Sequence, residues 1–257
     1  MGEFRVSASQ MEVTADIERN LQRIIAGIEQ AADNGSRLVA FPECAVSGYP
    51  PLHHKSLADI DTHRIAEAND EVARAAARCG LWVVFGTILA SSKGLTNSAL
   101  VVSDEGEIVG RYDKMHLMPM DKNFFVFGSE PCLFKMPETD FGVLICYDAR
   151  FPEPFRFLRN KGAKIIVVIS NACGSDTWKV PVLEGTYRTR ASENSCFVVA
   201  VNAAGPLQMA TSRIVNPLGL DLASSNQDCE EMISAQIDLS ETDSGYYPDR
   251  REDVFGW

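Results

Sequence analysis

A short apolar run that ends in a cysteine is the feature of this sequence that most restricts its fold. The segment Gly142–Glu153 reads GVLICYDARFPE, in which Val143–Ile145 precede Cys146 and a polar stretch. A run this short and rich in strand formers fits a buried strand, although periodicity alone does not separate it from a helix. Pro152 then opens a helical pattern, because proline is well tolerated in the first turn of a helix. The segment therefore predicts a strand, a polar turn and a helix.

Two interpretations of Cys146 follow from this position. Backbone N–H groups point outward at a strand-to-helix turn, and the positive potential of a helix start favours a thiolate. Cys146 is then a candidate nucleophile. Free cysteines are more often small buried hydrophobic residues, and the local sequence leaves this second interpretation open.

The composition is that of an ordinary folded protein and argues against several classes of function. Of the 257 residues, 46% are hydrophobic and 23% are charged, which is typical of a globular protein. The net charge of −11 and the lack of a Lys/Arg-rich patch argue against a nucleic acid or an anionic membrane as partner. No apolar run approaches the roughly 18 residues of a membrane span, and the N-terminus lacks a signal-peptide profile. We therefore expect a cytoplasmic protein.

The cysteines and histidines give no sign of a disulfide framework or a metal site. The seven cysteines include no CxxC pair, so neither paired disulfides nor a zinc knuckle is indicated. His53 and His54 are adjacent but do not form an HExxH pattern. Metal binding therefore has little support in the sequence.

The hydrophobic pattern predicts one domain, residues 1–257, of layered α/β type. Apolar residues at helical spacing predict helices, and short runs of strand formers between turns predict strands. Strands and helices alternate early in the chain and hairpins appear later, which places apolar strands between helices. The expected helices are Asp16–Asp33, Thr62–Cys79 and Trp178–Glu193, and Lys114–Gly128 is expected to be a structured loop. The expected strands are Phe4–Gln10, Leu38–Phe41, Leu81–Leu89, Leu95–Ser103, Glu107–Tyr112, Ile165–Ser170, Phe197–Val201, Ser212–Val215 and Met232–Ile237.

Residues 240–257 form a polar, turn-rich tail that nevertheless contains four aromatic residues. They are Tyr246, Tyr247, Phe255 and Trp257. Such side chains need burial, which docking on a partner subunit would provide. A fold back onto the same subunit would provide it equally well, so both arrangements remain open.

Three charged residues stand at or beyond the ends of apolar elements, as Cys146 does. Glu43 follows LVAFP, Lys114 lies in GRYDKMHL, and Asp121 lies in MPMDKNFFVFG. A cysteine nucleophile needs a base or a neighbouring cation, because a free thiol is only slightly ionised. Glu43 could take the thiol proton and return it to a leaving amine if burial raised its pKa. Lys114 and the Tyr147 backbone N–H could stabilise an oxyanion. Solvated or structurally paired charges are the alternative interpretation.

These segments strongly resemble the motifs of the nitrilase, or carbon–nitrogen hydrolase, superfamily. FPECAVSGYP is similar to the family's glutamate segment, with Glu43 in the catalytic position. YDKMHL is similar to its lysine segment, with Lys114, and GVLICYDARFPE to its cysteine segment, with Cys146. The flanking segments YRTRASEN, FVVAVNAAG, TSRIVNPLG and ISAQIDL also match, so the resemblance extends over roughly residues 4–240.

The resemblance implies a four-layer α-β-β-α sandwich that usually dimerises through helices and C-terminal tails. A homodimer or a higher homo-oligomer is therefore expected, with residues 240–257 at its interface. It also implies a centre in which Glu43, Lys114 and Cys146 act through a covalent thioester, which water activated by Glu43 hydrolyses. The implied reaction is hydrolysis of a non-peptide C–N bond in a small linear amide, without a metal or an organic cofactor.

One position departs from the family pattern. Many members carry a second glutamate in a pattern like E-x-x-x-F-x-x-G, where this chain reads DKNFFVFG and has Asp121. The family's second glutamate positions the lysine and the substrate. Aspartate reaches about 1.5 Å less far, and a misplacement of about that size can cost a hundredfold in rate. Either the loop lies closer to the lysine or the role is weakened, in which case a catalytically silent binding protein is the rival hypothesis.

The substrate within the superfamily remains open. Members that attack nitriles commonly carry Cys-Trp-Glu, whereas this chain has Cys146, Tyr147 and Asp148 in succession. This difference favours amides or N-carbamoyl (ureido) compounds over nitriles. An enzyme that transfers the acyl group to an amine would differ only in the acceptor. The residues expected to bind substrate are Tyr49, Phe125, Arg150, Asn171 and Trp178.

Two arginines could bind a substrate carboxylate in spite of the acidic net charge. They are Arg150 and Arg188. Structural ion pairing is the more common role of such residues, and it is the interpretation we favour for both from sequence alone. Packing in the core is likewise the alternative for the expected pocket aromatics.

Overall fold

Two sheets form the centre of the fold. In this computed structural model, which describes residues 3–176, 178–251 and 254, each sheet has six strands. The first sheet has the order β12 (Glu231–Asp238), β1 (Glu3–Gln10), β2 (Ser36–Ala40), β3 (Trp82–Ser91), β4 (Gly94–Val102) and β5 (Ile108–Asp113). The second has the order β11 (Asp221–Ser224), β10 (Arg213–Val215), β9 (Phe197–Asn202), β8 (Ile165–Ser170), β7 (Asp140–Ile145) and β6 (Leu133–Lys135).

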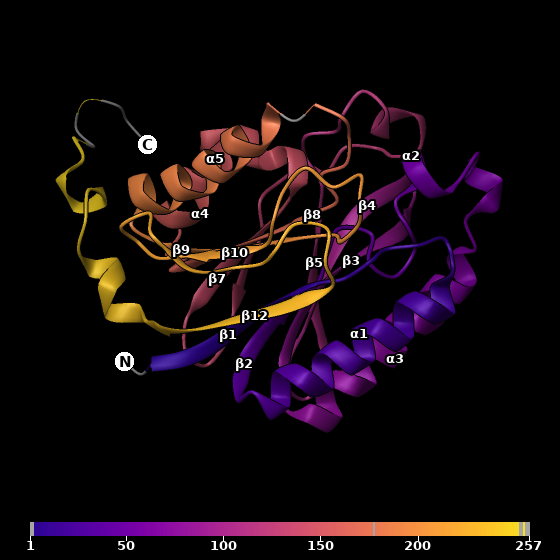
Figure 1. The fold of residues 1–257 in the computed structure, drawn as a ribbon, viewed down its shortest axis with the longest axis horizontal. Coiled ribbons are helices and arrows are strands. Elements are labelled where there is room, and N and C mark those ends of the chain that lie inside the picture. Colours follow the sequence, from indigo (N-terminus) through magenta and orange to yellow (C-terminus); the bar gives the residue numbers. More distant parts are fainter. Residues whose placement is uncertain (1–2, 177, 252–253, 255–257) are drawn as a thin grey trace.

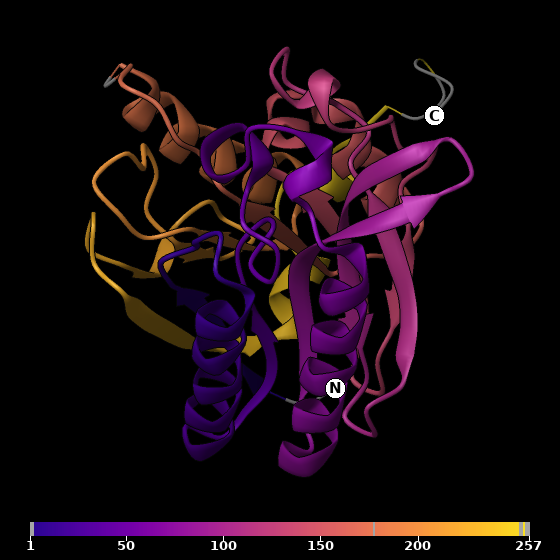
Figure 2. The same ribbon diagram turned by 90° about the vertical axis from the view of Figure 1, so that its right-hand side faces the viewer.

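Helices cover the outer face of each sheet. α1 (Ile17–Asp33) and α3 (Thr62–Cys79) pack on the first sheet, and α4 (Pro152–Asn160) and α5 (Lys179–Asn194) pack on the second (Figure 1; Figure 2). The expected four-layer α-β-β-α sandwich is therefore confirmed. The short helix α2 (Pro50–His53) and the strands β6 and β11 were not expected.

The helices begin and end where local capping chemistry places them. The side chain of Asp16 accepts a hydrogen bond from the Arg19 backbone N–H at the start of α1, and Asp61 accepts one from Arg64 at the start of α3. Gly80 ends α3 in the left-handed conformation, with φ of 60°. Such caps satisfy N–H and C=O groups that have no partner inside the helix.

The largest hydrophobic cluster lies between the two sheets. It joins side chains of the first sheet, such as Val6 and Val84, to side chains of the second, such as Leu144 and Val167. A second cluster lies between the first sheet and its helices, where Ile24 of α1 contributes. Strands buried on both faces are apolar along their whole length, which explains why β8 reads IIVVIS and is buried throughout.

The strand directions bring several loops to one edge of the sandwich. β1, β2 and β3 are parallel to one another, and β7, β8 and β9 form a second parallel set. β5 runs antiparallel to β4, which is antiparallel to β3, so β5 ends at the same edge as β2. In open α/β sheets, ligands bind beyond the carboxyl ends of the strands. The loops after β2, β5, β7 and β8 are therefore the first place to look for a site.

The described part of the C-terminal tail folds against its own chain. The Tyr247 hydroxyl donates to Asn160 Oδ1 at 2.8 Å, and the Arg159 guanidinium lies 4.5 Å from the centre of the Tyr247 ring. Tyr246 is 71% exposed, and Phe255 and Trp257 lie outside the described residues. The predicted homodimer through this tail stays a prediction.

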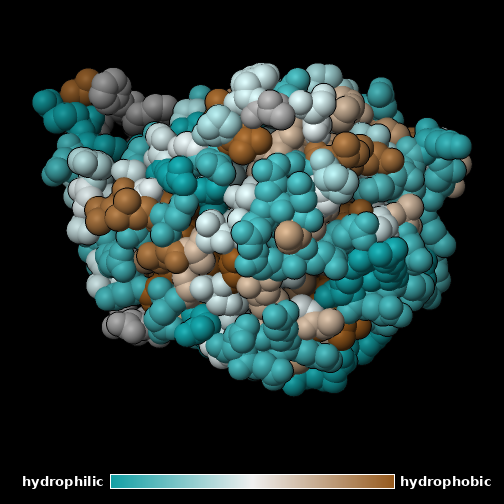
Figure 3. Space-filling view, viewed as in Figure 1, coloured by the Kyte–Doolittle hydropathy of each residue, from teal (hydrophilic) through white to brown (hydrophobic). Residues whose placement is uncertain are grey.

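The surface differs between the two helical layers. Figure 3 shows mostly hydrophilic residues over α1 and α3, whereas hydrophobic residues are more frequent near α5 and the C-terminal segment. Within residues 3–176, 178–251 and 254, no helix is long and apolar enough to cross a membrane.

Candidate active site

Glu43 stands in a buried turn directly after β2. Every residue of 41–50 is buried, because this turn packs against β3 at Gly86. The Gly86 N–H donates to Pro42 O at 3.1 Å, and a Cβ atom on Gly86 would lie 2.6 Å from Glu43 Cα. Only glycine therefore allows the turn to approach the strand so closely. Cys44, the next residue, has a φ of 52°, a conformation that non-glycine residues adopt at a cost.

Lys114 connects two carboxylates inside the protein. Its Nζ atom donates to Glu43 Oε1 and to Asp121 Oδ2, each at 2.7 Å, and the three side chains are fully buried. Lys114 directly follows β5, and Asp121 begins a short 3₁₀ helix in the loop that ends at Gly128. That loop is closed by a hydrogen bond of 2.9 Å from the Gly128 N–H to Lys114 O, which confirms the structured loop expected at Lys114–Gly128.

Other donors complete the surroundings of Glu43. Asn97 Nδ2 donates to Oε1 at 2.7 Å, and the Asn171 backbone N–H donates to Oε2 at 2.8 Å. Asn97 comes from β4 and Asn171 follows β8, so both sheets hold this carboxylate. Neither contact could be predicted from sequence, because the strand order of the first sheet brings Asn97 to Glu43 and the packing of the two sheets brings Asn171 to it.

The buried charges shift the pKa values of the central groups. Burial raises the pKa of the Glu43 carboxyl above its ordinary range, the Lys114 ammonium opposes this shift, and Asp121 adds to it. Burial disfavours the charged form of Lys114, but the carboxylates of Glu43 and Asp121 favour it and raise its pKa well above the ordinary value. Lys114 therefore stays protonated, and the raised pKa of Glu43 makes its carboxylate a better proton acceptor than an exposed one.

Cys146 stands at the turn between β7 and α4. It is the first residue of a 3₁₀ helix, Cys146–Arg150, and has a φ of 47°, which is a strained conformation for a non-glycine residue. Burial raises the pKa of the Cys146 thiol well above the ordinary value; Glu43 adds to the shift and Lys114 opposes it. The sequence led us to expect a favoured thiolate. The thiol is protonated instead, because burial and two carboxylates outweigh one ammonium, so attack requires a base.

Asp148 fixes the turn that carries Cys146. Its Oδ2 atom accepts hydrogen bonds from the Ile145 backbone N–H at 3.0 Å and from the Tyr112 hydroxyl at 2.7 Å. Its Oδ1 atom accepts from the His116 backbone N–H at 2.9 Å and lies 2.7 Å from His116 Nδ1. Asp148 and His116 each lie two residues beyond a central residue, Cys146 and Lys114 respectively. The contact between them therefore ties the two segments together.

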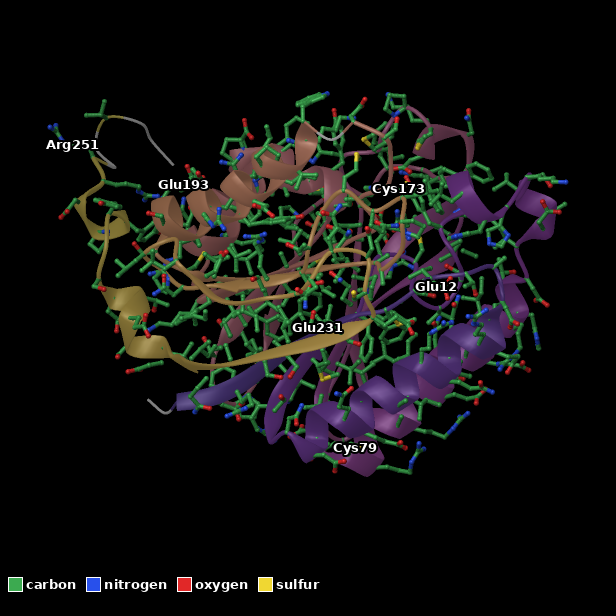
Figure 4. The ribbon with its side chains drawn as sticks, viewed as in Figure 1. Glu12, Cys79, Cys173, Glu193, Glu231 and Arg251 are labelled. Atoms are coloured by element: carbon green, nitrogen blue, oxygen red, sulfur yellow. The ribbon has the colours of Figure 1, made fainter. Side chains whose placement is uncertain are left out.

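Cys146 opens onto a pocket with a volume of about 100 Å³. The pocket is mostly apolar, with Met118, Leu183 and Met209 in its wall. Cys173 also lines it, and Figure 4 shows Cys173 in the loops beyond the strand ends, to the right of α5. Burial raises the pKa of the Cys173 thiol to about 11.

The structure brings three of the five expected substrate-binding residues to this pocket. Tyr49, Arg150 and Asn171 line it. Phe125 instead packs in the core cluster beneath α1 and α3, and Trp178 is 63% exposed. Neither is among the residues of the described chain that line the pocket. Tyr147, the expected backbone oxyanion donor, lies in the pocket wall beside Cys146.

The two arginines proposed for carboxylate binding have different surroundings. Arg188 forms an ion pair with Asp221 at 2.6 Å, which is the structural role favoured from sequence. Arg150 lies at the pocket. Lys179, which the sequence analysis did not single out, also lines the pocket and pairs with Asp176 at 2.6 Å.

Asp121 reaches Lys114 although its side chain is shorter than the glutamate of the family pattern. The loop lies close enough for Asp121 Oδ2 to reach Lys114 Nζ at 2.7 Å and to accept from the Met118 N–H at 3.0 Å. Its other oxygen, Oδ1, accepts a 2.5 Å hydrogen bond from the Tyr49 hydroxyl. Burial and the nearby carboxylates raise the pKa of the Tyr49 phenol, so Tyr49 stays a neutral donor. Its hydroxyl occupies space beside the shorter side chain.

We therefore expect a non-additive pair of substitutions at Tyr49 and Asp121. Asp121→Glu should lower kcat by about 100-fold, because the added methylene meets the Tyr49 hydroxyl and displaces Lys114. Tyr49→Phe should lower kcat by about 10-fold, because Oδ1 loses its donor inside the protein. The double variant should be more active than Asp121→Glu alone, since the missing hydroxyl leaves room for the methylene. Steady-state kinetics on one amide measures all three.

Matched controls separate this effect from a general loss of stability. Tyr246→Phe and Asp70→Glu make the same chemical changes at exposed positions and should leave kcat unchanged. A double variant whose loss equals the product of the two single losses would contradict the steric account.

No group of three or more His, Cys, Asp and Glu side chains among the described residues is arranged to hold a metal ion. The buried polar cluster is built instead from one ammonium, two carboxylates and a thiol. Asn171, whose backbone N–H donates to Glu43, and Tyr49, whose hydroxyl donates to Asp121, line the same pocket as Cys146, which puts the four groups at one site.

The fold and this cluster define a class of protein, and comparison with known proteins identifies it. The chain matches the model of the carbon–nitrogen hydrolase family over residues 5–247 and belongs to that family. The nitrilase-superfamily assignment made from the motifs is thus confirmed, as is the expectation of an enzyme of this class.

Named relatives match nearly the whole chain. An omega-amidase NIT2 from Xenopus tropicalis is 28% identical, across 93% of this chain and 90% of its own length. A 2-oxoglutaramate amidase from Bacillus subtilis (strain 168) is 29% identical, across 93% of this chain and 92% of its own length. The crystal structure of an amidase from Nesterenkonia sp. is 23% identical and has a TM-score of 0.85, covering 98% of this chain and 95% of that one.

Proposed function

We propose that this carbon–nitrogen hydrolase is an amidase that hydrolyses a small linear amide through a thioester on Cys146 and releases ammonia and a carboxylate. The observation that carries this proposal is the Lys114 ammonium held at 2.7 Å from both Glu43 and Asp121, with Cys146 in the wall of the adjoining pocket. Such a cluster combines a nucleophile, a base and a fixed cation.

The proposed reaction has two halves. Glu43 takes the thiol proton as Cys146 Sγ attacks the amide carbonyl, and Lys114 with the Tyr147 N–H stabilises the oxyanion that forms. The C–N bond then breaks, and Glu43 passes the proton to the leaving nitrogen, which departs as ammonia. In the second half, Glu43 removes a proton from water, whose oxygen attacks the thioester. The C–S bond breaks, the acid leaves, and the proton returns to the thiol.

The named relatives support an amide as substrate. The matches include an omega-amidase and a 2-oxoglutaramate amidase. In the Nesterenkonia amidase, a glutamate-to-glutamine variant shows covalent addition of the acetamide moiety of fluoroacetamide at the active-site cysteine. The role proposed for Cys146 is the corresponding one. Asp121 reaches Lys114, so the reason for suspecting a catalytically silent protein is weakened.

We further propose that Arg150 binds a carboxylate at the far end of the substrate. Arg150 lies four residues beyond Cys146 and lines the same pocket, with Lys179 as a second cation in the wall. Guanidinium groups bind carboxylates through two parallel hydrogen bonds. A linear amide with a terminal carboxylate therefore fits both the reacting centre and this cationic wall.

Arg150→Gln should then raise the KM for a carboxylate-bearing amide selectively. Hydrogen bonds to charged groups contribute about 1.5–3 kcal/mol, so the rise should be about 10- to 100-fold for the monoamide of succinic acid. The KM for butyramide, which has the same number of carbons but no charge, should change little. Arg188→Gln is the matched control, because Arg188 pairs with Asp221 instead. An equal rise in KM for both amides would exclude the carboxylate role.

A substrate panel tests the proposed function itself. Small amides, ureido acids and nitriles would be assayed for ammonia release, with Cys146→Ala as the negative control. We expect hydrolysis of amides, and release from ureido acids alone would instead identify an N-carbamoyl hydrolase. Product analysis with an added amine would detect acyl transfer. Failure to hydrolyse any compound in the panel would exclude the proposal.

A further inference from the structure

The two oxygens of the Glu43 carboxylate differ in how many donors they have. Lys114 Nζ and Asn97 Nδ2 both donate to Oε1 at 2.7 Å, whereas Oε2 has one donor among the described residues, the Asn171 N–H at 2.8 Å. A carboxylate oxygen has about two positions that accept hydrogen bonds. Both positions of Oε1 are therefore occupied, and the free acceptor position of the carboxylate is on Oε2.

The side chain of Asn97 is held in the orientation that presents Nδ2 to Glu43. Asn97 is fully buried in β4, and its Oδ1 atom accepts a hydrogen bond from the Cys44 thiol, with 3.7 Å between Sγ and Oδ1. Burial raises the pKa of that thiol well above its ordinary value, so Cys44 keeps the proton that it donates. The backbone of Asn97 is fixed as well, since its carbonyl oxygen accepts from the Lys114 N–H at 2.9 Å.

The partners of the two oxygens also lie in different parts of the site. The donor to Oε2 belongs to Asn171, which lines the same pocket as Cys146. The donors to Oε1 belong to Asn97 and Lys114, which come from the first sheet and are not among the described residues that line the pocket. The free acceptor position is therefore on the oxygen that the pocket wall holds.

We propose that Oε2 is the atom of Glu43 that carries the proton during the reaction, and that Asn97 is a positioning residue that keeps the proton off Oε1. In the first half of the reaction, the S–H bond of Cys146 breaks and the Oε2–H bond forms. The Oε2–H bond breaks in turn as the C–N bond of the substrate breaks, and the proton goes to the leaving nitrogen. This proposal rests on the proposed amidase function.

Asn97→Leu separates this role from a structural one. The Asn97 hydrogen bond favours the ionised form of Glu43, so its loss should raise the pKa of Glu43 and move the fall in kcat/KM at low pH upward by about one to two pH units. Lys114 and Asp121, the charged groups that also shift this pKa, stay in place. At higher pH, kcat should be about 10-fold lower, because Oε1 becomes a second position for the proton, while KM changes less than about twofold.

Asn69→Leu is the matched control. Asn69 is also buried, but its Oδ1 atom accepts from the Thr87 hydroxyl at 2.9 Å instead of serving Glu43. This variant should leave the pH of the fall in kcat/KM unchanged. Thermal unfolding verifies that each variant is folded. Asn97→Ala removes the same donor without adding an apolar side chain and takes the place of Asn97→Leu if that variant does not fold.

Infrared difference spectra between high and low pH identify the oxygen that binds the proton. The C=O stretch of protonated Glu43 is the band that Glu43→Gln lacks. With the proton on Oε2, the carbonyl oxygen is Oε1, so Asn97→Leu should move this band to higher wavenumber because Oε1 loses a donor. A band that does not move would mean that the carbonyl oxygen is Oε2 and would overturn the proposal.

The outcomes distinguish this proposal from the proposed function. A fall in kcat/KM at the same pH in Asn97→Leu as in the wild-type enzyme would overturn the proposal, and so would a loss of activity through KM alone. If the wild-type enzyme hydrolysed no amide, the proposed function would be rejected, whereas the infrared band would still report which oxygen of Glu43 binds the proton.

Discussion

Cys146→Ala should abolish amide turnover, with a loss on the order of 10⁵-fold or more, while the protein remains folded. The thioester cannot form without Sγ, and neither Glu43 nor Lys114 can replace a nucleophile. The substitution removes one atom from a pocket wall, so the free energy of unfolding should change by no more than about 1 kcal/mol. Ammonia release and chemical denaturation measure the two quantities.

Cys79→Ala is the matched control for this variant. Cys79 ends α3, and Figure 4 shows it on the opposite side of the molecule from Cys173 and the pocket. Its removal should leave turnover unchanged. Because Cys146 lines the pocket, a bound amide should protect it from iodoacetamide, which distinguishes it from the thiols outside the pocket. Full turnover in Cys146→Ala would end the case for a thioester.

Glu43→Gln is the variant for which we expect the second largest effect. General-base catalysis contributes about 10²- to 10⁴-fold, so kcat should fall by roughly 10³-fold or more. The amide also places an NH₂ group against either Lys114 Nζ or the Asn171 N–H, both of which donate to the carboxylate. KM should change less than kcat, because Glu43 acts on protons that move during the reaction.

The dependence of kcat/KM on pH tests the role of Glu43 more specifically. The pKa of the Glu43 carboxyl is raised above its ordinary value of 4.5 by burial. Glu43 must be ionised to take the thiol proton, so wild-type kcat/KM should fall as the pH drops through this raised pKa. The residual activity of Glu43→Gln should lack that acidic limb. Glu105 is exposed, so Glu105→Gln should keep the fall in kcat/KM at low pH. If Glu43→Gln also kept this fall, the fall would be due to another group.

Local signals predicted the long elements well. The helix Thr62–Cys79 was predicted with both ends correct, because Asp61 and Gly80 are capping residues next to it in the sequence. The strand Ile165–Ser170 was also predicted correctly from its apolar run. By contrast, β6 and β11 have only three and four residues and lie at sheet edges. They pair with the neighbouring strands of the chain, β7 and β10 respectively, and runs this short contain too few residues for a periodic pattern.

The residues of the candidate site also include some that local sequence predicted and some that it did not. Glu43, Lys114 and Cys146 could be picked out because each is a reactive group at the end of an apolar element and lies in a family motif. Asn97 and the Asn171 backbone could not, since Asn97 meets Glu43 through the strand order of the first sheet and Asn171 meets it through the packing of the two sheets. Phe125 and Trp178 were reasonable pocket aromatics by composition, yet one packs in the core and the other is largely exposed.

The sequence by itself determined the layered α/β class, the carbon–nitrogen hydrolase motifs and the residues that we propose to carry the chemistry. These follow from periodicity, capping and residue type, all of which act over a few neighbouring positions. Only the tertiary structure decided that Asp121 reaches Lys114 with Tyr49 beside it, and that the Cys146 thiol is protonated at rest. Both depend on burial and on charges from distant segments, and these groups are buried and brought together only when the two sheets pack.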